Sequence, residues 1–261
     1  MVYNKKQCLP GKGRAYEMMK GRTIMIKFQA TIKGKEIRMY SSSPLTQTGE
    51  MFIRTLNRIS DKTDIFQENF MLQYGWAPFF LKPKTEEDGT EVYVVESFDF
   101  LQNPPKRTED CSSALVIQNM QFDTFVRSKT PRPEPTTFKD KVLVLREALN
   151  APDVYMHRAD VTKDGDSGWY FGLLNDEREE EHTDEELVSV QSWELMKFRA
   201  EALRVLMLPV GTVAVFHDNE MTALVDGEDH PLDFSTAEER RKAIAAAAAR
   251  KPQTPAEEGN A

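Results

Sequence analysis

The sequence predicts an α+β protein with two small domains, each a mostly antiparallel sheet packed with helices. Three observations lead to this prediction. Short segments with alternating apolar residues recur along the chain, helical periodicity occurs in only a few places between them, and a proline-rich stretch divides the chain near its middle. A length of 261 residues and a hydrophobic content of 40% are sufficient for one large core or two ordinary ones.

The first predicted domain covers residues 1–127 and contains a small antiparallel sheet with two helices. Strands are recognised by alternation of apolar and polar residues, and helices by apolar residues three or four positions apart. Val92 and Val94 alternate and are followed by Val95 and Phe98, which breaks the strict alternation and indicates a β-bulge. The expected elements are a hairpin over 23–40 that turns at Lys33-Gly34, a helix over 46–59, short kinked strands over 70–80, a strand over 91–100 and a helix over 110–126.

A proline-rich segment, residues 128–140, separates the two halves. Pro131, Pro133 and Pro135 lie within five residues, and proline neither continues a helix nor donates a hydrogen bond to a sheet. We therefore expect an extended, semi-rigid linker between the two domains.

The second predicted domain covers residues 141–236 and is also α+β and mostly antiparallel. Ser192 is expected to cap a helix that runs to about Leu206. Residues 237–261 are expected to form an alanine-rich helix, opened by a capping box at Thr236, and a disordered tail. The expected strands lie at 141–145, 154–158, 169–174, 187–190, 212–216 and 221–225, with a turn of helix over 146–150.

Charge is distributed unevenly along the chain. Residues 1–140 hold 21 Lys and Arg against 17 Asp and Glu, a net charge of +4, whereas residues 141–236 hold 8 against 21, a net charge of -13. An acidic half of this kind repels nucleic acid and attracts a basic protein. We therefore expect a basic protein partner and no nucleic acid.

The most acidic stretch follows directly after the strand at 169–174. Carboxylates this close together repel one another, so the fold gains nothing from them unless a basic group neutralises them. Two interpretations remain open, a solvated acidic loop and a docking face for a basic partner. The carboxylates expected to bind the partner are Asp176, Glu177, Glu179, Glu180, Glu181, Asp184, Glu185 and Glu186.

Two short stretches flank this acidic segment. Residues 164–171 read Asp-Gly-Asp-Ser-Gly-Trp-Tyr-Phe, a tight turn that leads into an aromatic strand. Residues 206–216 read as a helix end, a Pro-Gly turn and an apolar strand. The tryptophans Trp76, Trp169 and Trp193 are expected to be core anchors, because Trp buries a large apolar area. The motif residues expected to be structural are Asp166, Gly168, Trp169, Pro209, Gly211 and Phe216.

Taken together, these stretches resemble the immunity-protein family thirty-three, which occurs in bacteria beside polymorphic-toxin genes. The resemblance covers roughly residues 141–234. It implies a protein that acts on a cognate toxin, and it supplies no catalytic residues.

Motifs for catalysis and metal binding are incomplete in this chain. Ser167 lies in Gly-Asp-Ser-Gly, one residue short of the nucleophile elbow. Residues 160–166 match a calcium loop only in part. No histidine pair has metal-ligand spacing, although convergence in space stays an alternative; the histidines are His157, His182, His217 and His230. We expect no catalytic residue, no metal site and no cofactor.

Cellular location is suggested by what the chain lacks. It has no apolar run of membrane-spanning length and no signal-peptide core, so we expect a cytoplasmic protein without a membrane partner. Cys8 and Cys111 are too few for a disulfide framework and are expected to be reduced thiols.

The leading hypothesis from the sequence is a non-enzymatic immunity protein that binds and neutralises a cognate, basic toxin through its acidic half. Two alternatives stay open. One is a small-molecule or metal-dependent enzyme that uses Asp166, His157 and the acidic segment, and the other is a regulatory or scaffolding protein. The sequence carries no signal of an oligomeric state.

Overall fold

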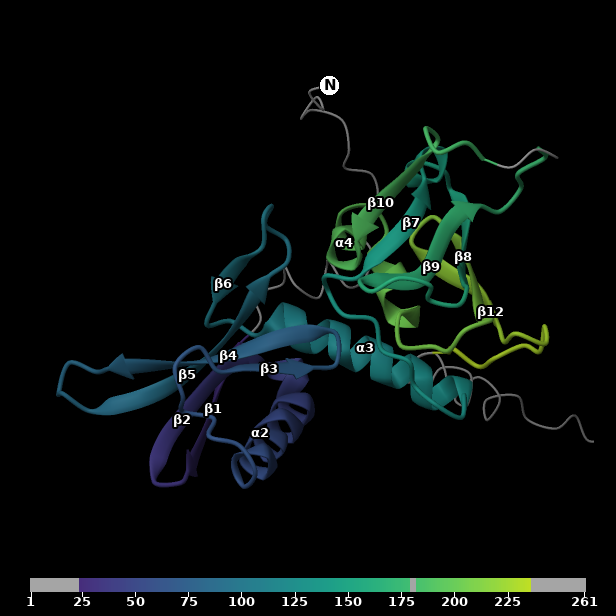
Figure 1. Ribbon diagram of the computed structural model, residues 1–261. Coiled ribbons are helices and arrows are strands. Elements are labelled where there is room, and N and C mark those ends of the chain that lie inside the picture. Colours follow the sequence, from purple (N-terminus) through teal and green to yellow (C-terminus); the bar gives the residue numbers. More distant parts are fainter. Residues whose placement is uncertain (1–23, 179–181, 236–261) are drawn as a thin grey trace, which may run out of the picture.

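Two six-stranded mixed sheets make up the protein in the computed structural model, which describes residues 24–178 and 182–235 (Figure 1). The first sheet belongs to the N-terminal half and the second to the C-terminal half, with short helices beside each. The predicted α+β class is therefore confirmed. Three parts of the predictions lie outside the described residues, namely the first residues of the N-terminal domain (1–23), the alanine-rich helix and tail at 237–261, and the acidic residues Glu179, Glu180 and Glu181.

The first sheet has the strand order β1-β2-β5-β4-β3, and β6 pairs with β5. The predicted hairpin is confirmed, because β1 and β2 pair antiparallel around Lys33 and Gly34, both of which have positive φ. Strand β6 is too short to be recognised from its sequence pattern. The elements are β1 (Met25–Ile32), β2 (Lys35–Ser42), α2 (Thr46–Ser60), β3 (Met71–Tyr74), β4 (Ala77–Thr85), β5 (Glu91–Asp99), β6 (Lys106–Thr108) and α3 (Ser112–Ser128).

The prediction of a bulge in β5 is wrong. Strand β5 pairs with β4 in an unbroken antiparallel register and with β2 in parallel. Val94 and Val95 point to opposite faces of the sheet, and both are buried. The apolar residues that looked out of phase therefore reflect a central strand that is covered on both faces.

The second sheet has the strand order β10-β7-β9-β8-β11-β12, in which only β7 and β9 are parallel neighbours among the described strands. Strand β10, which covers the strand predicted at 187–190, lies at the edge of the sheet. The elements are β7 (Lys141–Leu145), η2 (Arg146–Leu149), β8 (Asp153–Arg158), β9 (Asp166–Leu173), β10 (Leu187–Gln191), η3 (Ser192–Glu194), α4 (Leu195–Phe198), η4 (Ala200–Val205), β11 (Val213–His217) and β12 (Glu220–Val225).

The prediction of a single helix from Ser192 to Leu206 is wrong. The structure has three short helical pieces there, η3, α4 and η4, and Arg199 interrupts them with φ -150° and ψ 75°. Arg199 leaves the helical conformation with its side chain buried and its Nη2 donating to the carbonyl of Ala151 at 2.6 Å. Ser192 is not the expected cap, because Gln191 precedes the first turn and its N–H donates to the Glu194 carboxylate at 3.0 Å.

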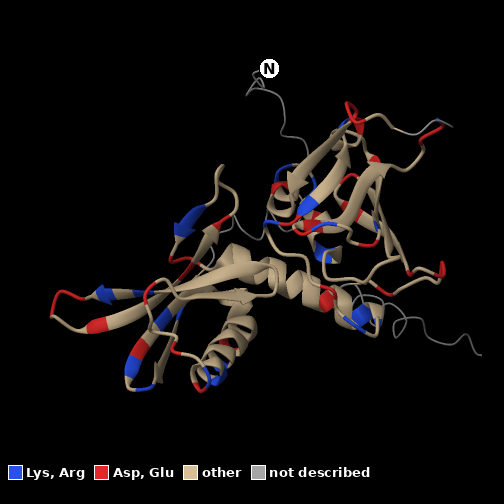
Figure 2. Ribbon diagram, in the orientation of Figure 1, with Lys and Arg blue, Asp and Glu red and all other residues tan. Residues whose placement is uncertain are grey.

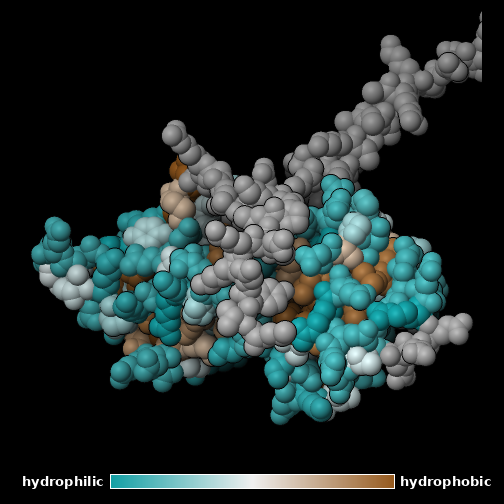
Figure 3. All heavy atoms as spheres, turned by 90° about the horizontal axis from the view of Figure 1, so that it is seen from above, coloured by the Kyte–Doolittle hydropathy of each residue, from teal (hydrophilic) through white to brown (hydrophobic). Residues whose placement is uncertain are grey.

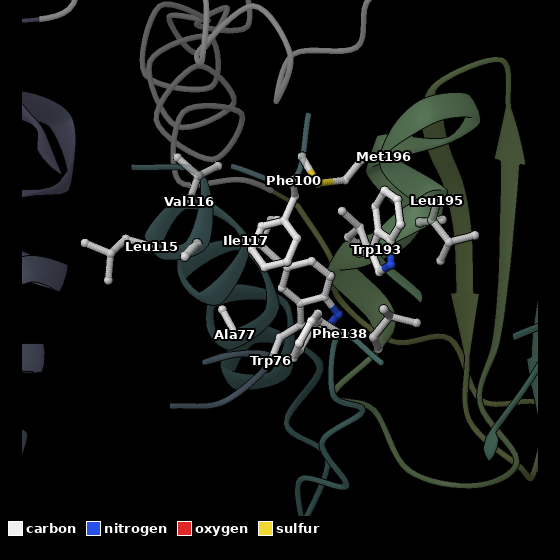
Figure 4. Close-up of a cluster of buried hydrophobic side chains, with 14 of the residues drawn as sticks. Trp76, Ala77, Phe100, Leu115, Val116, Ile117, Phe138, Trp193, Leu195 and Met196 are labelled. Carbon is white, nitrogen blue, oxygen red and sulfur yellow. The ribbon is translucent and has the colours of Figure 1, made fainter. Parts of the chain in front are cut away.

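The proline-rich segment is packed against both sheets. Phe138 is buried and contacts Trp76, with ring centroids 6.4 Å apart, and its backbone N–H donates to the Trp76 carbonyl at 2.9 Å. Trp76 Nε1 in turn donates to the Ser192 hydroxyl at 2.9 Å. Figure 4 shows these rings between Ile117 of the N-terminal half and Trp193 of the C-terminal half. One continuous apolar core therefore links the two sheets.

Helix α3 also joins the two halves (Figure 1). Its Gln121 amide is buried and donates to the carbonyl of Leu203 in η4 at 3.0 Å. Arg204 Nε donates to the Thr124 hydroxyl at 3.2 Å, one turn further along the helix. The helix that the sequence placed in the first domain therefore packs on the second as well. Within the described ranges, no helix is both long and apolar enough to cross a membrane.

Candidate interaction surface

The two motif stretches meet at one buried side chain, Arg158 at the end of β8. Its backbone N–H donates to the Thr212 carbonyl at 3.0 Å, and its carbonyl accepts the Gly211 N–H at 2.8 Å. Its guanidinium donates through Nη1 to the Leu208 carbonyl at 2.5 Å and to the Glu134 carbonyl. The guanidinium also lies 5.7 Å from the Trp169 ring. Arg158 therefore ties the Pro-Gly turn, the proline-rich segment and the aromatic strand together.

The electrostatic state of Arg158 follows from its burial. Removal from water lowers the pKa of the guanidinium, and the carboxylates of Glu134 and Asp140 oppose that shift. An arginine stays protonated under such a shift, so its charge must be met by carbonyl dipoles. Both of the carbonyl acceptors described above serve that purpose. The sequence offered no signal for this residue, because Arg158 stands at the end of an ordinary strand.

Another backbone segment lies so close to each of the motif glycines Gly168 and Gly211 that a side chain would not fit there. Gly168 has φ +76°, and a Cβ there would lie 2.2 Å from the Ala159 carbonyl oxygen. Gly211 has φ +86°, and its Cβ would lie 2.8 Å from Gly227 Cα. L-residues with a side chain rarely adopt such φ values, so both positions favour glycine for conformation and for space.

The remaining motif residues hold the same framework. Trp169 and Phe216 are buried in the core. The carbonyl of Pro209 accepts the hydroxyl of Thr212 at 2.7 Å. Asp166 opens β9 opposite Lys141. The Ser167 hydroxyl is buried and donates to the Lys141 carbonyl at 2.6 Å, which fits a turn residue.

The acidic segment joins β9 to β10 and is cross-linked by two of its own residues. Arg178 donates through Nη1 to Glu186 at 2.6 Å and through Nε to Asp176 at 3.1 Å. His182 Nε2 lies 2.9 Å from the second oxygen of Asp176. The hydrogen bond from Arg178 lowers the pKa of Asp176, and the backbone N–H of Thr183 lowers that of Glu186. Arg178 is therefore a basic group within the segment that offsets the expected repulsion at these two carboxylates.

The carboxylates that remain on this segment point to solvent. Glu177, Asp184 and Glu185 are exposed, while the backbone of the segment is anchored through Arg146. The Arg146 N–H donates to the Glu186 carbonyl at 2.9 Å and its Nε to the Glu185 carbonyl at 2.8 Å. Figure 2 shows carboxylates (red) around the β9–β10 connection at the upper end of the second sheet.

Residues 121–226 match the family model of the Imm33-like domain. Over this stretch, called the Imm33-like domain below, the chain is similar to that family. The resemblance seen in the motif stretches is thereby confirmed for the C-terminal half. No curated protein and no solved structure matches the chain.

The Imm33-like domain begins earlier than the motif stretches indicated. The match starts at Gln121, inside α3, whereas the sequence placed the second domain from Lys141 onward. The structure explains this start, because Gln121 and Thr124 are bonded to the η4 region of the same domain. The second half of α3 and the proline-rich segment are therefore integral to the packing of the Imm33-like domain.

Further carboxylates gather at the end of the Imm33-like sheet where the acidic segment lies. Asp153 begins β8 opposite His217, the last residue of β11, and Glu220 begins β12 opposite His217 from the other side. The Asp153 carboxylate lies 2.7 Å from His217 Nδ1, and this hydrogen bond raises the pKa of the imidazole. Sequence reasoning missed this grouping because only the strand register brings these residues together.

The other candidates from the sequence lie apart from one another. His157, His182, His217 and His230 sit on four different elements or loops, and the described ranges contain no group of three or more His, Cys, Asp or Glu placed to hold a metal ion. Cys111 is a free thiol buried beneath β5, where burial raises its pKa. A buried thiol with a raised pKa is a poor nucleophile.

Proposed function

We propose that this protein is a non-enzymatic immunity protein that binds a cognate bacterial toxin and neutralises it by covering its active site or substrate groove. The observation that carries the proposal is the Imm33-like match over residues 121–226, which contains the acidic segment. An immunity protein acts by stoichiometric binding, so it needs an exposed complementary surface and no catalytic group.

The charge of the domain supports a basic partner. Residues 141–236 carry a net charge of -13, from 8 Lys and Arg against 21 Asp and Glu. Two of the eight basic residues, Arg158 and Arg199, are buried and donate to backbone carbonyls, so they do not contribute to the surface that a partner meets. A surface of one sign steers an oppositely charged partner and raises its association rate. A nuclease-like toxin, whose groove is built for a polyanion, is the partner that fits this charge best.

The N-terminal half extends the available surface. Its sheet is fixed to the Imm33-like domain through α3 and the Trp76–Ser192 hydrogen bond. We propose that it widens the interface with the toxin or binds a second partner.

The proposed function is tested by measuring whether this protein protects cells from the toxin domain encoded by the neighbouring gene, and whether the two purified proteins bind each other. Co-expression of this protein should rescue cells from that domain, and the purified pair should form a stoichiometric complex. Failure of both protection and binding by the unaltered protein would refute the proposed function.

The role of the acidic segment in association is tested with two triple variants that change the net charge by the same amount. Glu177→Lys, Asp184→Lys and Glu185→Lys change three exposed carboxylates of the acidic segment. The control changes three exposed carboxylates of the N-terminal half by the same amount, through Asp61→Lys, Glu68→Lys and Glu87→Lys.

The first triple variant should slow association by about tenfold or more at low salt, whereas the control should slow it much less. Raising the salt from about 0.01 M to about 0.15 M, which shortens the Debye length from roughly 30 Å to 8 Å, should shrink the difference. Equal rates for both triple variants would show that the acidic segment is a solvated loop.

A further inference from the structure

The outer face of the second sheet carries aromatic and aliphatic side chains. In each strand, alternate residues point to opposite faces. On β7, Val142 and Val144 are buried in the core, whereas Leu143 between them is 42% exposed. The same alternation on β9 buries Trp169 and Phe171 and leaves Tyr170 half-buried on the outer side. This face is therefore apolar without belonging to the core.

The register places these outward side chains in two continuous rows across the sheet. Directly paired residues of neighbouring strands share a face and lie side by side. The first row runs through Leu143, Tyr170, His157, Val213 and Val225, and the second through Gly172, Tyr155, Val215 and Ala223. The first row crosses five strands, whose four spacings of about 4.8 Å make it roughly 19 Å long.

Tyr155 and Tyr170 form the centre of this face. Their rings meet edge to face with centroids 5.8 Å apart. Gly172 lies beneath the Tyr170 ring, because a Cβ there would be 2.5 Å from Cε1 of Tyr170. Among the described residues, neither tyrosine hydroxyl has a hydrogen-bond partner. Tyrosines that offer an apolar ring and a free hydroxyl are enriched at protein interfaces.

The acidic end of the sheet borders the tyrosine pair. Burial raises the pKa of the Tyr155 and Tyr170 hydroxyls, and the Asp176 carboxylate raises both further, while Arg178 acts in the opposite direction on Tyr170. Asp153 lies two residues before Tyr155 on β8. Seen from above, brown hydrophobic atoms reach the surface of the C-terminal part among teal hydrophilic ones (Figure 3). An apolar centre with an acidic border complements a basic surface with an apolar anchor.

We propose that the outer face of the second sheet, centred on Tyr155 and Tyr170, is the docking surface for a basic protein partner, the toxin domain of the proposed function. This inference rests on the proposed function and adds to it where the partner binds. An apolar or aromatic side chain of the toxin packs on the tyrosine pair, and its Lys and Arg side chains face Asp153 and the acidic segment. Binding energy then comes chiefly from the sheet face, and the acidic segment sets the association rate.

The test compares two substitutions on this face with a control elsewhere. Leu143→Lys and Tyr170→Ser alter outward side chains, and Met51→Lys alters a methionine of α2 that is 45% exposed, close to the 42% of Leu143. The probe is the purified toxin domain encoded by the neighbouring gene, and thermal melting checks that each variant folds. Leu143→Lys and Tyr170→Ser should each weaken binding by about tenfold or more, mainly through faster dissociation, while Met51→Lys binds like the unaltered protein.

Hydroxyl-radical footprinting of the unaltered complex makes the test independent of variant folding. Oxidation of Tyr155 and Tyr170 should fall on toxin binding. Full binding by both variants, or unchanged oxidation in a complex that forms, would overturn this docking surface and leave the proposed function standing. Absence of any complex with the unaltered protein would overturn both.

Discussion

Replacing Gly168 by alanine should destabilise the protein more than the same change at Gly165, three residues earlier. Both glycines have positive φ, +76° at Gly168 and +84° at Gly165, so both substitutions carry a left-handed strain of about 1–2 kcal/mol. The surroundings differ. Nothing lies within 4 Å of a Cβ at Gly165, whereas a Cβ at Gly168 would lie 2.2 Å from the Ala159 carbonyl oxygen.

The extra effect at Gly168 can be worked from that contact. A carbon and a carbonyl oxygen approach to about 3.3 Å in weak C–H···O contacts, so the two strands must separate by roughly 1 Å. That movement breaks the hydrogen bond from the Ala159 N–H to the Gly168 carbonyl, now 2.9 Å long, which contributes about 1 kcal/mol. It also displaces Trp169, the next residue, from its buried site. The strain and the lost hydrogen bond together should lower the free energy of unfolding of Gly168→Ala by about 2–3 kcal/mol, to which the displacement of Trp169 adds, against about 1–2 kcal/mol for Gly165→Ala.

Urea unfolding of the two variants beside the unaltered protein measures the difference directly. Equal losses at the two glycines would refute the argument, because φ strain alone would then account for both. A loss at Gly165 larger than that at Gly168 would contradict the backbone geometry of this turn.

Three further predictions follow from the packing and the charges. Trp169→Ala should lower the free energy of unfolding by about 3–5 kcal/mol through a core cavity, and an unchanged melting temperature would contradict its burial. Trp76→Phe removes the hydrogen bond to Ser192, and this loss should lower the free energy of unfolding by about 1 kcal/mol. Calorimetry should still show one unfolding transition for both halves. Two separated transitions would contradict the shared core. Asp153 raises the pKa of His217 in the folded protein. The stability that this pair adds to the fold is therefore fully present below about pH 6.5 and is lost as the pH rises through the raised pKa. Asp153→Asn should remove this pH dependence from unfolding curves measured between pH 5 and about pH 9, and an unchanged curve would contradict the pairing.

Local patterns were enough to predict most of the strands and the family motifs. The hairpin at Lys33 and Gly34 depends on two adjacent residues that accept positive φ, and the strands around Trp169 depend on alternation within a few residues. The requirement for glycine at Gly168 was also visible as a turn, although its cause, the carbonyl of Ala159, was not. Charge likewise depends only on composition, so the acidic C-terminal half was evident from the sequence.

Features that depend on distant partners were not predictable in this way. A helix-like pattern continues through Arg199, but the buried bond to Ala151 ends the helix there. The proline-rich segment looked like a free linker because nothing local shows that Phe138 packs against Trp76.

The fold class, most of the strand positions, the acidic character and the family resemblance were therefore predictable from the sequence, since each depends on neighbouring residues or on composition. Tertiary structure alone decided that Arg158 joins the two motif stretches, that Asp153 and His217 meet beside the acidic segment, and that Tyr155 and Tyr170 share an outer face. The physical reason is the register between strands far apart in the chain. A shift of one residue would turn each of these side chains to the opposite face of the sheet.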